Sequence, residues 1–143
     1  MVIDIRKAKP EDFESVYQFV CELQTRVFDK AILKRLYLEN ILKKDNLYLV
    51  AVRNELPIGY LSCHIQILLH HAGKVAEIQE MFVLPGFRSH GVGQQLIEEI
   101  KRLTKKEGAL QLEVTTRAIR EKAIAFYQRE SFEDSHKKLV YYF

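Results

Sequence analysis

Residues 77–93 read EIQEMFVLPGFRSHGVG, and this stretch decides the fold. Its first half is β-prone and ends at Pro85-Gly86, which predicts a strand over residues 75–83. Its second half spells Arg-x-x-Gly-x-Gly from Arg88 to Gly93 and leads into an amphipathic pattern that predicts a helix over residues 91–106. The sequence therefore predicts a strand, a glycine-rich turn and a helix in direct succession.

Such a turn is suited to binding an anion. The first backbone N–H groups of a helix have no intrahelical partner and point outward. Gly91 and Gly93 let a bulky ligand approach the backbone, and Arg88 adds a guanidinium that can bind phosphate oxygens. The absence of Gly-Lys-Ser/Thr excludes a P-loop, and the spacing does not fit the Gly-x-Gly-x-x-Gly dinucleotide pattern. A turn that simply needs glycine is the alternative interpretation.

The rest of the chain predicts further strands over residues 2–6, 47–52, 58–69, 109–115 and 138–143. Helices are expected to begin near Pro10 and after Asp29, which is placed to cap the second one, and to cover residues 91–106 and 121–130. This order predicts an α/β fold of the mixed α+β kind: a mostly antiparallel sheet with helices on both faces. The segment from 75 to 115 should form one parallel crossover.

Composition favours a single ordinary globular domain over residues 1–143. The chain is 48% hydrophobic and 29% charged, and its net charge of +3 is too small to indicate a nucleic-acid partner. The two cysteines, Cys21 and Cys63, fit buried thiols in a reducing compartment. No apolar run has the length of a signal peptide or a membrane span. We therefore expect a cytoplasmic location and no membrane partner.

A second motif extends the pattern: residues 123–132 read AIAFYQRESF. With both motifs in this order, the chain resembles the GNAT superfamily of acetyl-CoA-dependent N-acetyltransferases over essentially its whole length. It is most similar to the bacterial aminoalkylphosphonate N-acetyltransferases, through Cys21-Glu22-Leu23, His64-Ile65-Gln66, His70-His71, residues 77–80 and Ser135-His136. The sequence departs from the superfamily at two positions, where Ser131 replaces a usual glycine and Arg120 a frequent asparagine.

The resemblance implies an acetyl-CoA site on the turn and on the preceding strand. The pyrophosphate is expected on the backbone of Arg88, Ser89, His90, Gly91, Val92, Gly93 and Gln94. The pantetheine arm is expected to pair like an added strand with Met81, Phe82 and Val83. Simple exposure is an equally good explanation of the Ser89 and His90 side chains.

The implied reaction requires an acid and a base. A protonated amine must lose a proton before it attacks, so a nearby carboxylate is useful. Glu77 matches the superfamily's base and is the first candidate, and Glu80 is the second. Strict alternation would place Glu77 and Gln79 on one face of their strand and Glu80 on the other. Tyr127 matches the superfamily's general acid, although an aromatic residue at a helix end can also serve packing alone.

Other polar residues are candidates for holding the substrate. If Gln66 pairs with Glu77 across the hairpin, His64 and Gln66 share a face with Glu77 and Gln79, whereas a slip of one residue would break this arrangement. His64 could then shuttle a proton or bind a metal ion with Glu77, but no metal ligand is assigned. For an anionic substrate the candidate cations are Arg26, Lys30, Arg117 and Arg120.

Three functions fit these residues. The first is an N-acetyltransferase for a small primary amine such as an aminoalkylphosphonate. The second keeps the cofactor but accepts a peptide or a polyamine, and the third is a non-catalytic acyl-CoA-binding module. The joint presence of Glu77 and Tyr127 favours an enzyme. Because members of the superfamily often form dimers, a homodimer is also considered.

Overall fold

The sheet is the centre of the computed structural model, which describes all of residues 1–143. Its strands lie in the order β1 (Asp4–Lys7), β2 (Asn46–Arg53), β3 (Leu56–Leu68), β4 (Gly73–Val83) and β5 (Gln111–Val114). The pairs β1–β2, β2–β3 and β3–β4 are antiparallel, and only the pair β4–β5 is parallel. The predicted mixed, mostly antiparallel sheet with one parallel crossover is confirmed.

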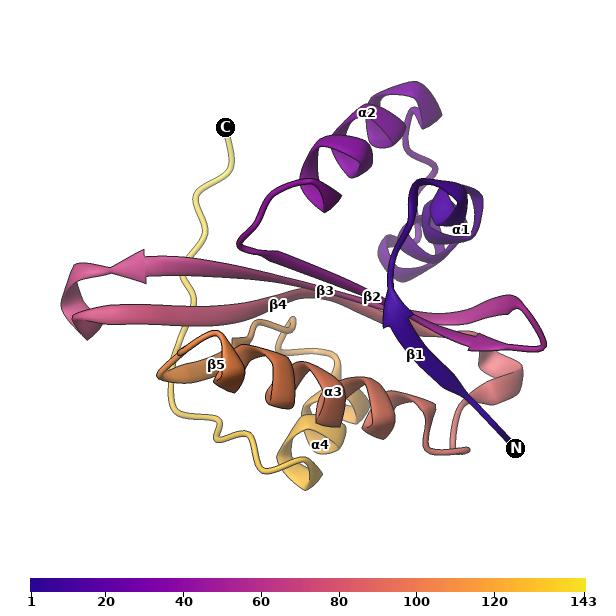
Figure 1. Ribbon diagram of the computed structural model, residues 1–143. Coiled ribbons are helices and arrows are strands. Elements are labelled where there is room, and N and C mark those ends of the chain that lie inside the picture. Colours follow the sequence, from indigo (N-terminus) through magenta and orange to yellow (C-terminus); the bar gives the residue numbers. More distant parts are fainter.

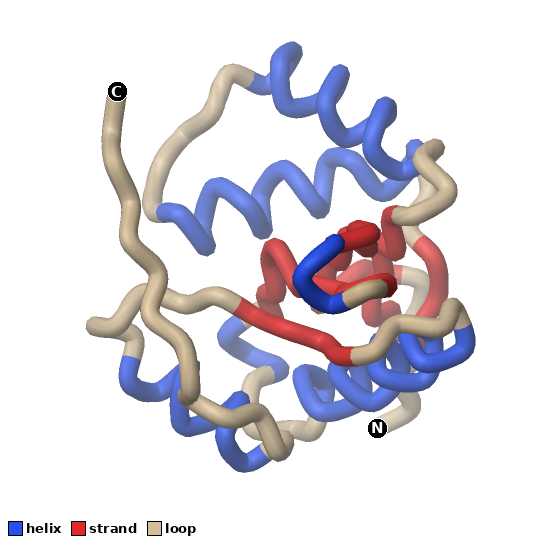
Figure 2. The backbone as a smooth tube through the Cα atoms, turned by 90° about the vertical axis from the view of Figure 1, so that its left-hand side faces the viewer, coloured by secondary structure: helices blue, strands red, loops and turns tan.

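Four helices cover the two faces of this sheet (Figure 1). The helices α1 (Phe13–Gln24) and α2 (Lys30–Ile41) lie on one face, and α3 (Val92–Lys106) and α4 (Glu121–Arg129) lie on the other. The perpendicular view in Figure 2 shows the same three layers. None of the helices combines the length and the apolar character that crossing a membrane requires.

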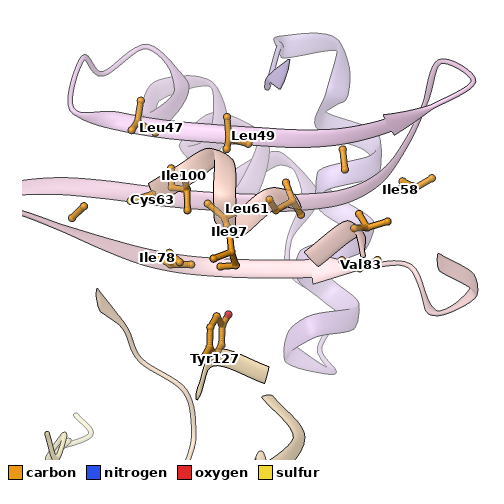
Figure 3. Close-up of a cluster of buried hydrophobic side chains, with 14 of the residues drawn as sticks. Leu47, Leu49, Ile58, Leu61, Cys63, Ile78, Val83, Ile97, Ile100 and Tyr127 are labelled. Carbon is orange, nitrogen blue, oxygen red and sulfur yellow. The ribbon is translucent and has the colours of Figure 1, made fainter. Parts of the chain in front are cut away.

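Each face of the sheet has its own hydrophobic core. On one side, Leu96, Ile97 and Ile100 of α3 are fully buried against inward-facing residues of β2, β3 and β4 (Figure 3). On the other side, Phe19 of α1 stacks on Phe82 of β4 with ring centroids 5.2 Å apart. Burying a side chain of this size contributes about 1.5–3 kcal/mol. The two cores therefore fix β4 between both helical layers.

A buried ion pair anchors the start of α1 to the edge strand β1. Asp12 is 6% exposed, and its carboxylate accepts hydrogen bonds from both terminal nitrogens of Arg6, at 2.8 and 2.9 Å. It also accepts from the Lys9 backbone N–H at 2.7 Å, in the manner of a helix cap. Burial alone would raise the pKa of Asp12, but these hydrogen bonds and the charge of Arg6 hold its pKa below the ordinary value.

The substitution Asp12→Ala should lower the free energy of unfolding by roughly 2 kcal/mol, because hydrogen bonds to a charged group contribute about that much. Glu11→Ala in the same turn is the matched control, because Glu11 is exposed; its effect should stay within about 0.5 kcal/mol. Because the folded pKa of Asp12 lies below the unfolded value, its contribution is complete above pH ~5 and is lost as the pH falls through the folded pKa. Urea unfolding at pH 7 and pH 3 measures this, and an unchanged deficit at both pH values would contradict it.

Three local expectations need correction. The final strand predicted over residues 138–143 is absent, and these residues are exposed and pair with no strand. The helical spacing of Leu33, Leu36, Tyr37 and Ile41 predicts an apolar stripe on the second helix, but Leu36 is 41% exposed and only Tyr37 of α2 is fully buried. Glycine at position 73 predicts the turn before the strand over residues 75–83, but Gly73 begins β4 and the left-handed residue of the preceding turn is Ala72. The Asp29 cap is confirmed, since its carboxylate accepts from the Ile32 N–H at 3.0 Å.

Candidate functional site

The strand β4 loses its parallel neighbour halfway along its length. Residues Val75 to Ile78 pair with Gln111 to Val114, and β5 then ends while β4 continues to Val83. On the β5 side, the main-chain edge of residues 79–83 therefore pairs with no strand. Unpaired N–H and C=O groups on such an edge can hydrogen-bond an extended ligand.

The glycine-rich turn lies at the end of this free edge. Ser89 and Gly91 both adopt left-handed backbone conformations, with φ of +65° and +79°. Gly91 is the N-cap of α3 and provides no side-chain cap, and the Gln95 N–H is the first to reach its carbonyl, at 3.0 Å. A Cβ built on Gly91 would meet no atom within 4 Å. The start of α3 thus offers backbone N–H groups to an open space that suits an anion.

The other two motif residues have packing roles. The Arg88 side chain folds back toward β4, where its Nε donates to the Val83 carbonyl at 2.8 Å and its guanidinium lies 5.3 Å from the Phe82 ring centroid. A Cβ on Gly93 would come within 3.3 Å of the Phe126 ring, so this glycine lets α3 and α4 approach each other. Arg88 therefore fastens the turn to the strand while its terminal nitrogens stay available to an anion.

Tyr127 lies beneath β4 on the face that α3 and α4 cover. Its ring is 9% exposed and packs edge-on against Phe126 and Phe132, while its hydroxyl points toward the sheet (Figure 3). The hydroxyl makes no hydrogen bond within the protein. Because every buried side-chain polar atom does have a hydrogen-bond partner, this oxygen is not among the buried atoms and reaches solvent. Burial raises the pKa of Tyr127 to about 12, opposed by the charge of Arg120. The phenol is thus protonated throughout the neutral range.

The turn after α4 resolves one departure from the superfamily pattern. Ser131 adopts φ of +73°, the left-handed conformation that a glycine there would take without strain. The Phe132 N–H then donates to the Tyr127 carbonyl at 3.0 Å, so the helix end is closed as it would be with glycine. Ser131 thus takes the conformation that favours glycine, and the turn behind Tyr127 is closed by this hydrogen bond.

A β-bulge decides which way the two carboxylates point. Ser62 pairs with Glu80 and Cys63 with Ile78, so Gln79 is an extra residue without a partner on β3. The bulge reverses the alternation, and Glu77 and Glu80 lie on the same sheet face, the one that α1 and α2 cover. The expectation that Glu80 points to the opposite face from Glu77 is wrong for this reason, and Gln79 is exposed instead.

Both carboxylates are held by hydroxyl groups. Glu80 Oε1 accepts from the Ser62 hydroxyl at 2.6 Å and from the Tyr60 hydroxyl at 3.3 Å, and both of these residues are buried. Glu77 Oε2 accepts from the Thr115 hydroxyl at 3.0 Å, just beyond the end of β5. Glu80 therefore has two donors on one oxygen, whereas Glu77 has one donor in an exposed setting.

His64 lies directly opposite Glu77, because β3 and β4 pair 64 with 77 and 66 with 75. The observed register differs by two residues from the expected pairing of Gln66 with Glu77. Because side chains alternate with a period of two, His64 and Gln66 still share a face with Glu77. His64 Nε2 lies 2.8 Å from the Tyr48 hydroxyl, and that hydroxyl accepts from the Asn40 amide at 3.0 Å. Burial lowers the pKa of His64 and raises the pKa of Tyr48 to about 12. These shifts favour a neutral imidazole that accepts the Tyr48 proton.

No three His, Cys, Asp or Glu side chains come together as a metal site. The candidate cations fall into two groups. Lys30 is engaged by Glu14 at 2.6 Å, and Arg26 lies over the Phe28 ring at 4.9 Å. Arg117 and Arg120 are exposed in the segment between β5 and α4 and form no salt bridge. Of the four, these two follow β5 in the chain and have no salt-bridge partner, and Arg120 is near enough to Tyr127 for its charge to act on that phenol.

Sequence reasoning did not identify the residues that hold the carboxylates and the histidine: Tyr48, Tyr60, Ser62 and Thr115. The alternation of Tyr60, Ser62 and His64 places these three polar side chains on one strand face, and that signal was available. The register with β4 and the bulge at Gln79 were needed to bring them beside Glu77 and Glu80.

Known proteins resemble the chain in sequence and in three-dimensional structure. Residues 11–132 match the model of the acetyltransferase (GNAT) family. The aminoalkylphosphonate N-acetyltransferase of Salmonella typhimurium is 36% identical over 135 residues, which cover 94% of this chain and 88% of that protein. A transcriptional regulator from Bacillus halodurans superimposes with a TM-score of 0.91 at 25% identity, covering 99% and 100% of the two chains. An aminoglycoside N-acetyltransferase in complex with CoA has the same fold, with a TM-score of 0.89 at 20% identity over 99% and 94%.

Proposed function

The chain belongs to the GNAT family of acetyltransferases, and from this premise we propose that it transfers the acetyl group of acetyl-CoA to the primary amine of a small aminoalkylphosphonate. One observation carries the assignment of roles: Tyr127 lies on one face of β4, and Glu77 and Glu80 lie on the other. Glu77 is in the last stretch of β4 that pairs with β5, and Glu80 lies just beyond it, where that pairing has ended. A proton donor and a proton acceptor thus flank a free strand edge. The substrate class is supported by the 36% identity to the Salmonella enzyme over most of both chains.

The residues at the free edge and the turn fit acetyl-CoA. Open space at Gly91 and the uncapped start of α3 suit the pyrophosphate, and the terminal nitrogens of Arg88 can add a charged contact. The unpaired edge at Met81, Phe82 and Val83 suits the amide groups of the pantetheine arm. When bound, acetyl-CoA supplies an acetyl thioester, which a neutral amine can attack directly.

Glu77 acts in this proposal as the base that takes a proton from the incoming ammonium group. Its carboxylate has a single hydroxyl donor, Thr115, so lone pairs remain for the substrate. Glu80 shares the face but is held by two buried hydroxyls, which favours a positioning role for it. His64, Gln66 and Gln79 are proposed to contact the substrate around these carboxylates.

Tyr127 acts as the acid that gives its proton to the departing sulfur. Its hydroxyl is directed toward β4 and makes no competing hydrogen bond inside the protein. Its raised pKa keeps the proton available at neutral pH. As the amide forms and the C–S bond breaks, the attacking nitrogen loses its second proton to water. The CoA thiol and the N-acetylated product leave, Glu77 releases its proton to water and Tyr127 regains one, so the reaction releases one net proton.

Arg117 and Arg120 are proposed to bind the phosphonate group. Both are exposed, form no salt bridge and lie between β5 and α4, so their guanidinium groups can turn toward an anion at the free edge. A charge-assisted contact of this kind is worth about 1.5–3 kcal/mol, roughly 10-fold to 150-fold in affinity.

Arg120→Ala and Arg117→Ala should each raise KM for an aminoalkylphosphonate by about 10-fold or more and leave KM for acetyl-CoA within about twofold. Arg26→Ala is the matched control and should leave both constants unchanged, because that guanidinium lies on the Phe28 ring. Steady-state thiol release measures these constants. Equal losses with an uncharged amine of the same length would contradict phosphonate binding by these arginines.

The remaining partner assignments are also proposals. We propose that the protein acts in the cytoplasm, where acetyl-CoA is available, and that its acceptor is a small molecule. We propose no nucleic-acid partner and no membrane partner. A homodimer is proposed as well, because members of the superfamily often form dimers.

A further inference from the structure

A chain of hydrogen bonds runs from α2 to the imidazole of His64 on β3. The Asn40 amide, in the last turn of α2, donates to the Tyr48 hydroxyl of β2 at 3.0 Å. That hydroxyl lies 2.8 Å from His64 Nε2, and the two rings stack with their centroids 5.6 Å apart. The Asn40 backbone carbonyl in turn accepts from the Asn46 amide at 3.0 Å. The elements α2 and β2 therefore fix the Nε2 side of the imidazole.

The donors in this chain determine where the imidazole proton lies. A tyrosine hydroxyl has one proton to donate and two lone pairs that accept. One lone pair of Tyr48 takes the Asn40 amide, and His64 Nε2 is the other group that bonds this hydroxyl. If Nε2 carried a proton, it would donate to the second lone pair, and the proton of the buried Tyr48 would have no acceptor in the protein. The arrangement that pairs every proton has Tyr48 donating to Nε2, so neutral His64 carries its proton on Nδ1.

The surroundings keep this imidazole neutral. Burial is the largest influence and lowers the pKa of His64, and the positive charge of Lys43 acts in the same direction. The carboxylates of Glu80 and Glu77 oppose this effect, but the pKa of His64 stays below its ordinary value. Burial also raises the pKa of Tyr48 to about 12, so its hydroxyl keeps the proton that it donates. An imidazole held in this way has no free lone pair for a proton from the substrate.

The Nδ1 side of the ring is open and lies beside the proposed base. His64 Nδ1 makes no hydrogen bond within the protein, and because every buried side-chain polar atom has a partner, Nδ1 reaches solvent. His64 is directly opposite Glu77 across β3 and β4, and the Cβ atoms of such a pair lie about 4.5–5.5 Å apart. One unpaired N–H donor is therefore next to the carboxylate that is proposed to receive the amine.

This donor and this carboxylate match the two ends of a short aminoalkylphosphonate. A few methylene groups separate the ammonium group of such a molecule from its phosphonate, so the two ends can reach neighbouring side chains of one strand pair. The ammonium group can meet the Glu77 carboxylate, whereas a phosphonate oxygen can accept from His64 Nδ1–H. A hydrogen bond to an ionised acceptor is roughly twice as strong as one between neutral groups. The N–H of His64 therefore favours an acceptor with an anionic end.

We propose that Asn40 and Tyr48 are positioning residues that hold His64 in its Nδ1–H tautomer, and that this N–H donates to a phosphonate oxygen of the acceptor. The inference rests on the proposed function, because it names a group that recognises the acidic end of the aminoalkylphosphonate. It assigns His64 to substrate recognition instead of proton transfer. Tyr48 and Asn40 act through His64 and do not contact the substrate.

The first test measures the tautomer by NMR, through correlations between the ¹⁵N ring nitrogens and the carbon-bound ring protons at pH 7.5. The signals of His64 are those that disappear in His64→Gln. They should show a protonated Nδ1 and an unprotonated Nε2. Tyr48→Phe keeps the ring but removes the donor, so the proton should move to Nε2, which neutral histidine prefers in water. A protonated Nε2 in the wild type, or a tautomer that Tyr48→Phe leaves unchanged, would overturn the proposal without reference to any activity.

The second test uses two replacements of His64 that each keep one side of the ring. In His64→Asn the amide nitrogen can take the place of Nδ1 and donate, whereas in His64→Gln the amide oxygen can take the place of Nε2 and accept from Tyr48. KM for 2-aminoethylphosphonate should rise about 10-fold in His64→Gln and stay within about threefold in His64→Asn. The value of kcat/KM for ethanolamine, which lacks the phosphonate, should change less than about twofold in both. The opposite order would show that His64 merely supports Tyr48 and would overturn the proposal.

A binding measurement separates failure of this inference from failure of the proposed function. Added to the wild-type protein with CoA, 2-aminoethylphosphonate should shift the ¹⁵N resonance of His64 Nδ1, and ethanolamine should not. A shift without turnover of the aminophosphonate would refute the proposed reaction and support the contact. Turnover without the shift would overturn the contact alone, and the absence of both would overturn the two proposals together.

Discussion

Tyr127→Phe should lower kcat about 100-fold or more while KM for both substrates stays within about twofold. The change removes only the hydroxyl that is proposed to protonate the departing sulfur, and general acid catalysis of this kind contributes roughly 10²–10⁴-fold. The ring still fills its place against Phe126 and Phe132. Because the hydroxyl has no partner inside the protein, the free energy of unfolding should change by less than about 0.5 kcal/mol.

Tyr37→Phe is the matched control for this variant. Tyr37 is also a buried tyrosine, but it lies on the opposite face of the sheet and its hydroxyl donates to the Lys9 carbonyl at 2.6 Å. We expect it to lose about 1 kcal/mol of stability and to keep kcat. Because the pKa of Tyr127 is about 12, wild-type activity should show no loss from tyrosine ionisation below pH ~10.5. A kcat for Tyr127→Phe within threefold of wild type would rule out the acid role.

Glu77→Gln should lower kcat/KM at pH 7 by about 100-fold, because an alkylammonium group with a pKa near 10 then lacks its base. The loss of kcat/KM relative to the wild type should shrink as the pH rises, by up to tenfold per pH unit, since a growing fraction of the free amine is already neutral. This pH dependence distinguishes loss of a base from loss of structure. A deficit that stays constant from pH 7 to pH 9.5 would contradict the role of Glu77.

Glu80→Gln tests the competing carboxylate on the same sheet face. The amide oxygen can still accept from Ser62 and Tyr60, so the local geometry is retained while the charge is lost. We expect a loss below about tenfold with no recovery at high pH. A larger, pH-dependent loss in Glu80→Gln than in Glu77→Gln would transfer the role of base to Glu80.

The sequence predicted those parts of the fold that depend on local patterns. The recurrence of apolar residues every 3.6 positions predicted α3, and the Asp29 carboxylate was expected to cap α2, as it does. The Arg-x-x-Gly-x-Gly turn was expected between β4 and α3 and lies there. These features depend on residues close together in the chain, so a single sequence contains the information for them.

The parts that failed depend on pairing between distant segments. Alternation assigned Glu80 to the wrong face, because the bulge at Gln79 is defined only by the register between β3 and β4. The hydroxyl donors Ser62 and Thr115 were not identified for the same reason, since they approach the carboxylates from β3 and from the residue that follows β5. Residues 138–143 have the composition of a strand, but a strand also needs an edge to pair with, and these residues pair with no edge of the sheet.

The most direct test of the proposed function is thiol release from acetyl-CoA with 2-aminoethylphosphonate, compared with ethanolamine, spermidine and a lysine peptide at pH 7.5. Each amine is assayed with and without a divalent metal ion, since the metal requirement of the reaction is a separate question. The proposal predicts that kcat/KM for the aminophosphonate exceeds every other value by at least about 100-fold, the contribution of one or two charge-assisted contacts to the phosphonate. A preference for the peptide or spermidine would contradict the substrate class. Acetyl-CoA binding without turnover of any amine would contradict the assignment as a small-amine acetyltransferase.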